Sequence, residues 1–156
     1  MPASPSPSSS LVVVTGASSG IGLELALEAA RAGHPVLLVA RGVPALETAA
    51  AAAADAGSPA AYVLGADLGT SEGIDAVVAE VERIDLPIAA LVNNAGFGDW
   101  GPFGEQDVER IATMVDLNCR AVVVLTRRLL DRVRDARGGV LTVASTAAFQ
   151  PGPGMA

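Results

Sequence analysis

Thr15-Gly16-Ala17-Ser18-Ser19-Gly20-Ile21-Gly22 is the stretch of sequence that decides the fold. It follows a short run rich in β-branched residues and precedes a segment of helix-forming apolar residues. Glycines placed between a strand and a helix allow a tight turn, close approach of the backbone to a ligand, and packing of the helix on the strand. The free N–H groups at the start of the helix favour a bound pyrophosphate. The spacing therefore favours a dinucleotide-binding loop over a plain tight turn.

Segments of strand and helix character alternate along the rest of the chain. The predicted strands are 11–15, 36–40, 61–64, 88–92 and 140–143, and the predicted helices are 21–32, 44–57, 71–84 and a long, bent 105–137. Such alternation calls for parallel pairing with right-handed crossovers. The expected fold class is α/β, a doubly wound parallel sheet (Rossmann fold), truncated after the fifth strand.

Length and composition indicate one domain. A chain of 156 residues with 51% hydrophobic but only 3% aromatic residues suits a Val-, Leu- and Ala-rich parallel sheet covered by helices. Residues 1–10 are rich in Pro and Ser and lack basic residues and an apolar segment, so we expect a flexible tail rather than a signal peptide. Residues 11–156 are expected to form a dinucleotide-binding domain that is incomplete at its C-terminus.

Charge and residue usage exclude several classes of partner. The net charge of −7 argues against nucleic acid, and no apolar run is long enough to predict a membrane span. A single cysteine, Cys119, excludes an internal disulfide and fits a reducing, cytoplasmic compartment. We expect Cys119 to be buried and structural. The lone His34 has no second ligand nearby in the sequence and is also expected to be structural, so no metal site is predicted.

A second motif, Asn93-Asn94-Ala95-Gly96, follows the fourth predicted strand. Together with the first loop it resembles the classical short-chain dehydrogenases/reductases, which carry Thr-Gly-x-x-x-Gly-x-Gly after the first strand and Asn-Asn-Ala-Gly after the fourth. The resemblance extends from about Leu11 to Ala156. It implies an NADP(H)-dependent oxidoreductase that interconverts a small-molecule alcohol and a carbonyl compound.

The resemblance also implies a set of cofactor-binding residues in the loops after the first, third and fourth strands. They are Gly16, Ser18, Ser19, Gly20, Ile21, Gly22, Asp67, Leu68, Asn94, Ala95 and Gly96. Arg41 directly follows the second strand, where the adenosine ribose is expected, and an arginine there can hold a 2′-phosphate. We therefore favour NADP, with NAD as the alternative cofactor; Arg41 could instead be an ordinary exposed residue at a strand end.

Two further residues are candidates for catalysis. Asn118 falls between Val115 and Val122 on the apolar stripe of the long helix, where a buried amide needs hydrogen-bond partners. The family places an Asn here to hold a water in a proton relay, although a core Asn satisfied by the backbone is a competing interpretation. Ser145 is expected to close the fifth strand, where the family has a serine that hydrogen-bonds the substrate oxygen. Aromatic residues after the Asn motif either shape the substrate side or cover it: Phe97, Trp100 and Phe103.

The family also uses a Tyr-x-x-x-Lys motif for proton transfer and for holding the nicotinamide ribose. This chain has no lysine, and its only tyrosine, Tyr62, belongs to the third predicted strand. We therefore expect an N-terminal portion of a longer, homo-oligomeric enzyme, inactive on its own and left with an apolar edge strand at 140–143. The alternative is a non-catalytic nucleotide-binding or regulatory module.

Overall fold

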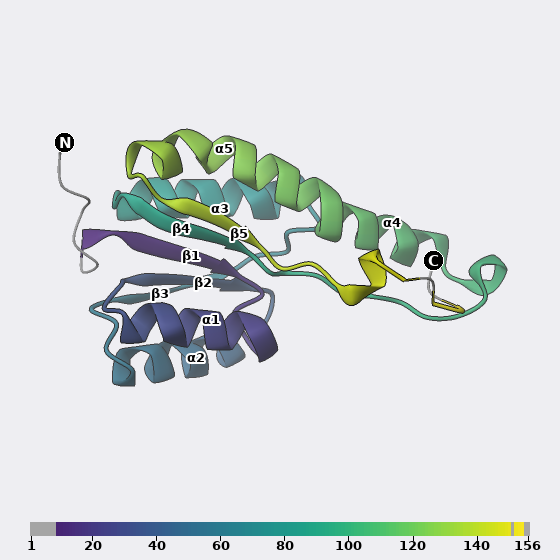
Figure 1. Ribbon diagram of the computed structural model, residues 1–156, viewed down its shortest axis with the longest axis horizontal. Helices are drawn as coiled ribbons and strands as arrows, with labels where there is room; N and C mark the ends of the chain where they lie inside the picture. The colour runs from purple at the N-terminus through teal and green to yellow at the C-terminus, as the bar shows by residue number, and fades with distance from the viewer. Residues whose placement is uncertain (1–8, 151, 155–156) are drawn as a thin grey trace.

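The computed structural model describes residues 9–150 and 152–154 (Figure 1). Its centre is one sheet of five strands in the order β3-β2-β1-β4-β5, and every neighbouring pair is parallel. The strands are β1 (Leu11–Thr15), β2 (Val36–Ala40), β3 (Ala61–Gly65), β4 (Ile88–Asn93) and β5 (Gly139–Thr142). The doubly wound α/β sheet predicted from the sequence is therefore confirmed.

Helices cover both faces of the sheet, as Figure 1 shows. On one face lie α1 (Gly20–Arg31) and α2 (Val43–Asp55), and on the other lie α3 (Ser71–Ile84) and α5 (Val122–Asp135), while α4 (Val108–Val115) projects beyond the ends of the strands. Alternate residues of a strand point to opposite faces. Val13 of β1 accordingly packs in the core beneath α3 and α5, while Val14 packs in the core beneath α1 and α2. A strand buried on both sides explains the unbroken Leu-Val-Val-Val run.

The helix ends show the capping features that their sequences favour. Gly33, just past the end of α1, adopts a φ of 84°, the left-handed conformation that terminates many helices. Thr70 caps α3, since its hydroxyl accepts a hydrogen bond from Gly73 N at 3.0 Å. Pro44 lies in the first turn of α2.

The long predicted helix differs from expectation. A short 3₁₀ turn, η2 (Phe103–Glu105), comes first, and α4 begins only at Val108 because the Asp107 carboxylate caps it through Glu109 N. Between α4 and α5 the chain makes π-type turns, η3 (Asp116–Ala121). The wider turns change which side chains face the sheet. Two expectations were wrong: Cys119, within these turns, is exposed rather than buried, and Val115, at the end of a helix with no buried residue, is 53% exposed.

At the N-terminal end of the described residues, Ser10 packs against the rest of the domain. Ser10 is buried, and its carbonyl oxygen accepts a hydrogen bond from His34 Nδ1 at 2.9 Å. His34 is thus structural, as predicted. The remainder of the proposed tail, residues 1–8, lies outside the described residues, as does Pro151 in the Pro/Gly-rich segment. None of the helices within 9–150 and 152–154 is long and apolar enough to cross a membrane.

The strand order places a topological switch point at the centre of the sheet. The chain builds outward from β1 to β2 and β3, then returns to lay β4 on the other side of β1. The loops after β1 and β4 therefore diverge at the carboxyl edge of the sheet and leave a crevice between them, the usual ligand position in open α/β sheets.

Candidate functional site

A cleft of about 1120 Å³ opens at this carboxyl edge. The residues predicted from the sequence meet there, although they come from loops far apart in the chain. Those that line the cleft are Gly16, Ser18, Ser19, Ile21, Arg41, Asp67, Leu68, Asn94, Ala95, Gly96, Asn118 and Ser145. Gly20 and Gly22 do not line it. Among the described residues, no group of three or more His, Cys, Asp or Glu is placed to hold a metal ion.

Glycine is required at the three positions of the first loop for different structural reasons. Gly16 has a φ of 66°, and a Cβ there would lie 2.7 Å from Asn94 Nδ2 and 2.9 Å from Ala95 Cα. A Cβ on Gly22 would overlap both Asn94 Nδ2 and the Gly16 carbonyl. Gly20 has a φ of 57°, but a Cβ there would meet no described atom within 4 Å. Gly16 and Gly22 thus serve close packing, whereas Gly20 serves the backbone turn.

Thr15 and Asn94 join the loops after β1 and β4. The Thr15 hydroxyl donates to the Val92 carbonyl at 3.1 Å and accepts from the N–H groups of Asn94 and Ala95 at 2.9 and 3.0 Å. The Asn94 amide in turn donates to the carbonyls of Thr15 and Gly16 at 3.0 and 3.2 Å. Thr15 belongs to the first-loop motif but was not predicted to be a site residue. A threonine at the end of a buried strand was the available signal.

The N-terminus of α1 is arranged to receive an anion. Ser19 occupies the N-cap position with an extended backbone, yet its hydroxyl makes no capping hydrogen bond to any residue that the structure describes. The first turn of α1 contains no acidic residue. The first N–H groups of a helix have no partner within the helix and carry the positive end of its dipole. A phosphate group beside Ser18 and Ser19 therefore fits this site.

Arg41 and Asp67 lie at the other end of the cleft, after β2 and β3. Arg41 is exposed, and within 9–150 and 152–154 its guanidinium has no ion-pair or hydrogen-bond partner. The Asp67 carboxylate accepts a hydrogen bond from Gly69 N at 3.0 Å, and Leu68 beside it is buried in the core. A cation at this position and an anchored carboxylate beyond it match the two polar ends of a phosphorylated adenosine.

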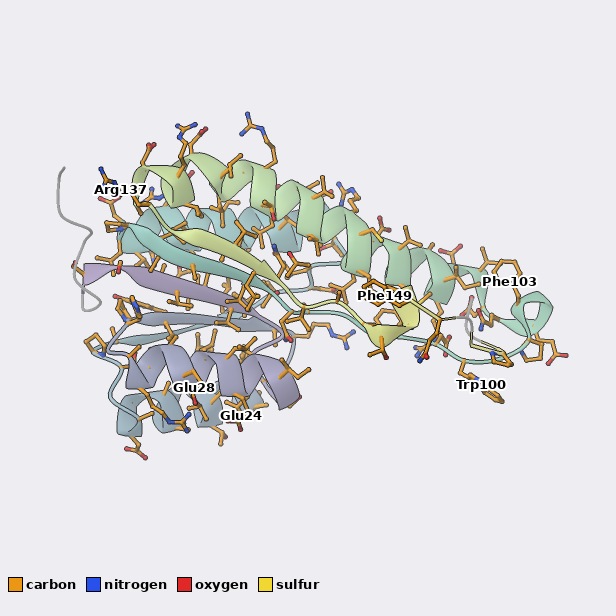
Figure 2. All side chains as sticks on the ribbon, in the orientation of Figure 1. Glu24, Glu28, Trp100, Phe103, Arg137 and Phe149 are labelled. Atoms are coloured by element: carbon orange, nitrogen blue, oxygen red, sulfur yellow. The ribbon has the colours of Figure 1, made fainter. Side chains whose placement is uncertain are left out.

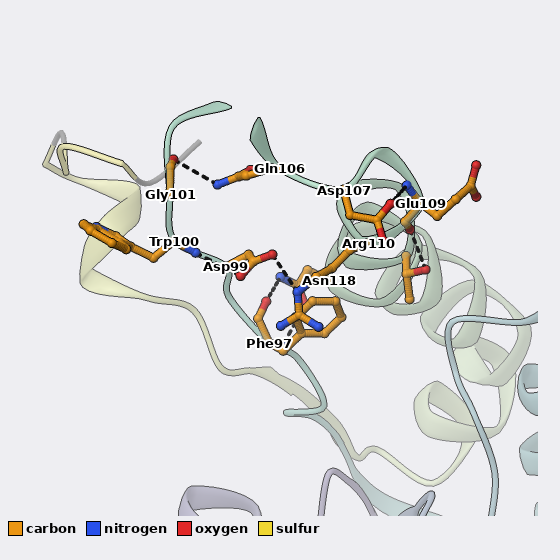
Figure 3. A network of polar contacts seen from close by, with 10 residues as sticks. Phe97, Asp99, Trp100, Gly101, Gln106, Asp107, Glu109, Arg110 and Asn118 are labelled. Atoms are coloured by element: carbon orange, nitrogen blue, oxygen red, sulfur yellow. Dashed lines mark hydrogen bonds and ion pairs between the residues drawn. The ribbon is translucent and has the colours of Figure 1, made fainter. Parts of the chain in front are cut away.

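Asn118 lies in η3 and is exposed, which corrects the expectation that it is buried. Its amide nevertheless has two partners: Phe97 N donates to Oδ1 at 3.1 Å, and Nδ2 donates to the Phe97 carbonyl at 2.8 Å (Figure 3). The side chain projects over the loop after β4 rather than into the sheet. Asn118 therefore clamps the backbone of the cleft wall.

Ser145 lines the cleft but does not close the fifth strand. The β4–β5 ladder ends at the pair Asn93 and Thr142, so β5 stops three residues before Ser145. Ser145 instead begins the 3₁₀ turn η4 (Thr146–Ala148), where its hydroxyl oxygen accepts a hydrogen bond from Ala147 N at 3.1 Å. Of the aromatic residues, Phe97 lines the cleft, whereas Trp100 and Phe103 project at the far end of the molecule (Figure 2).

Comparisons with known proteins agree with this geometry. An 11-beta-hydroxysteroid dehydrogenase A of Sesamum indicum is 35% identical over 146 residues, which cover 93% of this chain and 42% of that protein. The chain thus spans less than half the length of this curated relative. L-sorbose reductase of Gluconobacter frateurii, solved with NADPH and L-sorbose, is 37% identical with a TM-score of 0.85, over 92% of this chain and 55% of that one. A short-chain dehydrogenase of Sphingobium yanoikuyae, solved with NADPH, is 36% identical with a TM-score of 0.85, over 94% and 57%.

The family model of the short-chain dehydrogenases matches residues 10–156, nearly the whole chain. The matched residues include both glycine-containing motifs and all five strands of the sheet. This chain belongs to the short-chain dehydrogenase family.

Proposed function

We propose that this chain binds NADP(H) and serves in the interconversion of a small-molecule alcohol and a carbonyl compound. The observation that carries the proposal is the cleft itself, with the N-terminus of α1 on one side and Arg41 on the other, neither of which has a side-chain partner among the described residues. Two solved relatives bound to NADPH support the choice of cofactor. NAD is the alternative, and it would leave Arg41 without a phosphate partner.

Each predicted residue has a proposed role in this cleft. Ser18, Ser19 and the first turn of α1 would hold the pyrophosphate, Arg41 the 2′-phosphate, and Asp67 the adenine. The nicotinamide, when bound, supplies or accepts a hydride. The remaining proposed cofactor contacts are Gly16, Gly20, Ile21, Gly22, Leu68, Asn94, Ala95 and Gly96. On the substrate side, the Ser145 hydroxyl would hydrogen-bond the reacting oxygen, and Asn118 would hold the backbone beside it.

The 156-residue chain is proposed to bind without turnover. A reaction at a carbonyl needs a group that gives or takes a proton at the oxygen. The chain has no lysine, and its single tyrosine, Tyr62, lies on β3. Strand β3 is at the opposite edge of the sheet from β5, after which Ser145 follows. Tyr62 therefore has no route to a substrate held at Ser145.

Three broader expectations remain proposals. Residues 11–156 are proposed to act as one dinucleotide-binding unit, because the loops that line the cleft all extend from one five-stranded sheet and its helices. We propose a cytoplasmic location, which the single unpaired cysteine supports. Homo-oligomer formation is supported by exposed apolar side chains on α4 and α5, namely Val108, Val115, Val123 and Leu130.

The test is parallel titration of the chain with NADPH and NADH, with nicotinamide fluorescence as the readout of binding. We expect saturable binding with NADPH preferred. Substituting Arg41→Asp should weaken NADPH binding at least about tenfold, or about 1.4 kcal/mol, and leave NADH binding less affected. Arg127→Asp makes the same charge change on α5, away from the cleft, and should leave both affinities unchanged. Equal loss in the two variants, or no binding by the wild-type chain, would overturn the proposal.

A further inference from the structure

The loop that follows β4 forms a wall of the cleft and is held mainly by contacts distant in sequence. We define it as the Phe97–Gly101 loop. Phe97, Gly98 and Asp99 line the cleft directly. The loop begins immediately after Gly96, so it lies beyond the dinucleotide-binding motifs and on the side of Ser145. Whatever fixes this loop also fixes the shape of that end of the cleft.

Arg110 of α4 contacts this loop in two places (Figure 3). Its Nε donates to Asp99 Oδ2 at 2.6 Å, and its guanidinium lies over the Phe97 ring, 5.1 Å from the ring centre. The second carboxylate oxygen, Asp99 Oδ1, accepts a hydrogen bond from Trp100 N at 3.0 Å. Asp99 is therefore engaged at both oxygens, and its side chain is only 23% exposed. One arginine thus fixes both a charge and an aromatic ring of the wall.

The Phe97–Gly101 loop also contacts the segment that follows β5. Trp100 Nε1 donates to the Pro153 carbonyl at 3.0 Å, and Gly101 N donates to the Gly154 carbonyl at 2.8 Å. Gly154 has a φ of 76° and packs against the Trp100 indole. Gly152, two residues earlier, lines the cleft. The position of this lining segment therefore depends on Trp100, which depends in turn on Asp99 and Arg110.

We propose that Arg110 is a positioning residue for the nicotinamide- and substrate-binding end of the cleft, acting through Asp99 and Phe97 on the loop that also anchors the segment after β5. This inference rests on the proposed binding of NADP(H). An arginine suits the role because its planar guanidinium pairs with a carboxylate and stacks on an aromatic ring at the same time. Without it, a bound ligand must order the loop, and the entropy of that ordering weakens binding.

The first test compares two ligands on the wild-type chain and on Arg110→Leu. NADPH occupies both ends of the cleft, whereas adenosine 2′,5′-bisphosphate occupies only the adenosine end. We expect Arg110→Leu to weaken NADPH binding roughly fivefold and to leave the bisphosphate unaffected. Arg127→Leu is the matched control, since it removes an exposed arginine whose ion pair with Asp131 is remote from the cleft. Equal weakening of both ligands, or no change in NADPH binding, would overturn the positioning role.

A second test needs no cofactor and therefore separates this inference from the proposed function. Trp100 is the only tryptophan in the chain, so its fluorescence anisotropy reports on the loop. We expect faster local motion of Trp100 in Arg110→Leu and in Asp99→Asn, with the double variant no more mobile than either. Arg110→Lys, which keeps the charge but not the planar group, should be intermediate. Wild-type anisotropy in Arg110→Leu would overturn the inference, whereas a wild-type chain that binds neither ligand would overturn only the proposed function.

Discussion

Substituting Gly22→Ala tests the packing on which the proposed cofactor end of the cleft depends. A Cβ at position 22 would lie within 3.0 Å of Asn94 Nδ2, the Gly16 carbonyl oxygen and the Gly16 carbonyl carbon. Two of these atoms are backbone and cannot move alone. Asn94 is held by hydrogen bonds to Thr15 and Gly16, so displacing it breaks both. The added methyl group must therefore separate α1 from the loop that follows β1.

The magnitude follows from these contacts. Overpacking a filled site costs about 1–3 kcal/mol, and each of the two Asn94 hydrogen bonds contributes about 1 kcal/mol. The better helix propensity of alanine offsets about 1 kcal/mol. We expect a loss of about 3 kcal/mol in the free energy of unfolding, or about 6–12 °C in melting temperature for a domain of this size. Urea denaturation, monitored by circular dichroism, measures this loss in the free energy of unfolding.

Gly104→Ala is the matched control for Gly22→Ala. Gly104 has no positive φ, and a Cβ there would meet no described atom within 4 Å. This variant should unfold within about 0.5 kcal/mol of the wild-type chain. If Gly22→Ala proved as stable as Gly104→Ala, the close approach of α1 to the first loop would not constrain the fold, and the reasoning would be refuted.

Three further predictions concern other parts of the chain. Thr15→Val should lower the free energy of unfolding by about 2–4 kcal/mol, because the N–H groups of Asn94 and Ala95 lose their acceptor. Thr15→Ser, which keeps the hydroxyl, should retain most of the wild-type stability in the same urea assay. The hydrogen bond from Arg83 lowers the pKa of Glu80 below its ordinary value of 4.5. The difference in unfolding free energy between wild type and Glu80→Gln should therefore be present above pH 4.5 and disappear as the pH falls through the folded-state pKa. A difference that is independent of pH would contradict this prediction. Leu141→Lys, on the exposed edge strand β5, should reduce light scattering on heating, and unchanged scattering would show that this edge is not where chains associate.

The sequence predicted the sheet well because the relevant signals are local. Each predicted strand is present, with ends that differ by at most one residue, since runs of Val, Leu and Ala bounded by Gly or Pro are typical of buried parallel strands. The first loop and the Asn motif were located for the same reason. Their meeting at one cleft followed from topology, because parallel strands bring their carboxyl ends to the same edge.

The errors occurred where tertiary contacts override local pattern. Regular helical spacing placed Val115 and Asn118 on a buried face, but Asn118 lies in the π-type turns that shift this spacing, and Val115 lies in α4, which has no buried residue. Ser145 was assigned to a strand end because nothing local marks where the β4–β5 ladder stops. The contact of Trp100 with Pro153 joins residues 53 positions apart, and no periodicity predicts such a pair.

The proposed cofactor end and the proposed substrate end of the cleft differ in how they are built. The cofactor end depends on a buried threonine, on glycines with no room for a side chain and on the ladder between β1 and β4. The substrate end depends on exposed side chains, with Arg110 53% and Trp100 74% exposed. Exposed ion pairs contribute little to stability and are weakened further by salt, whereas salt does not screen buried hydrogen bonds. Raising the salt concentration should therefore weaken the Arg110–Asp99 ion pair and increase the local motion of Trp100, while the glycine turn stays unchanged.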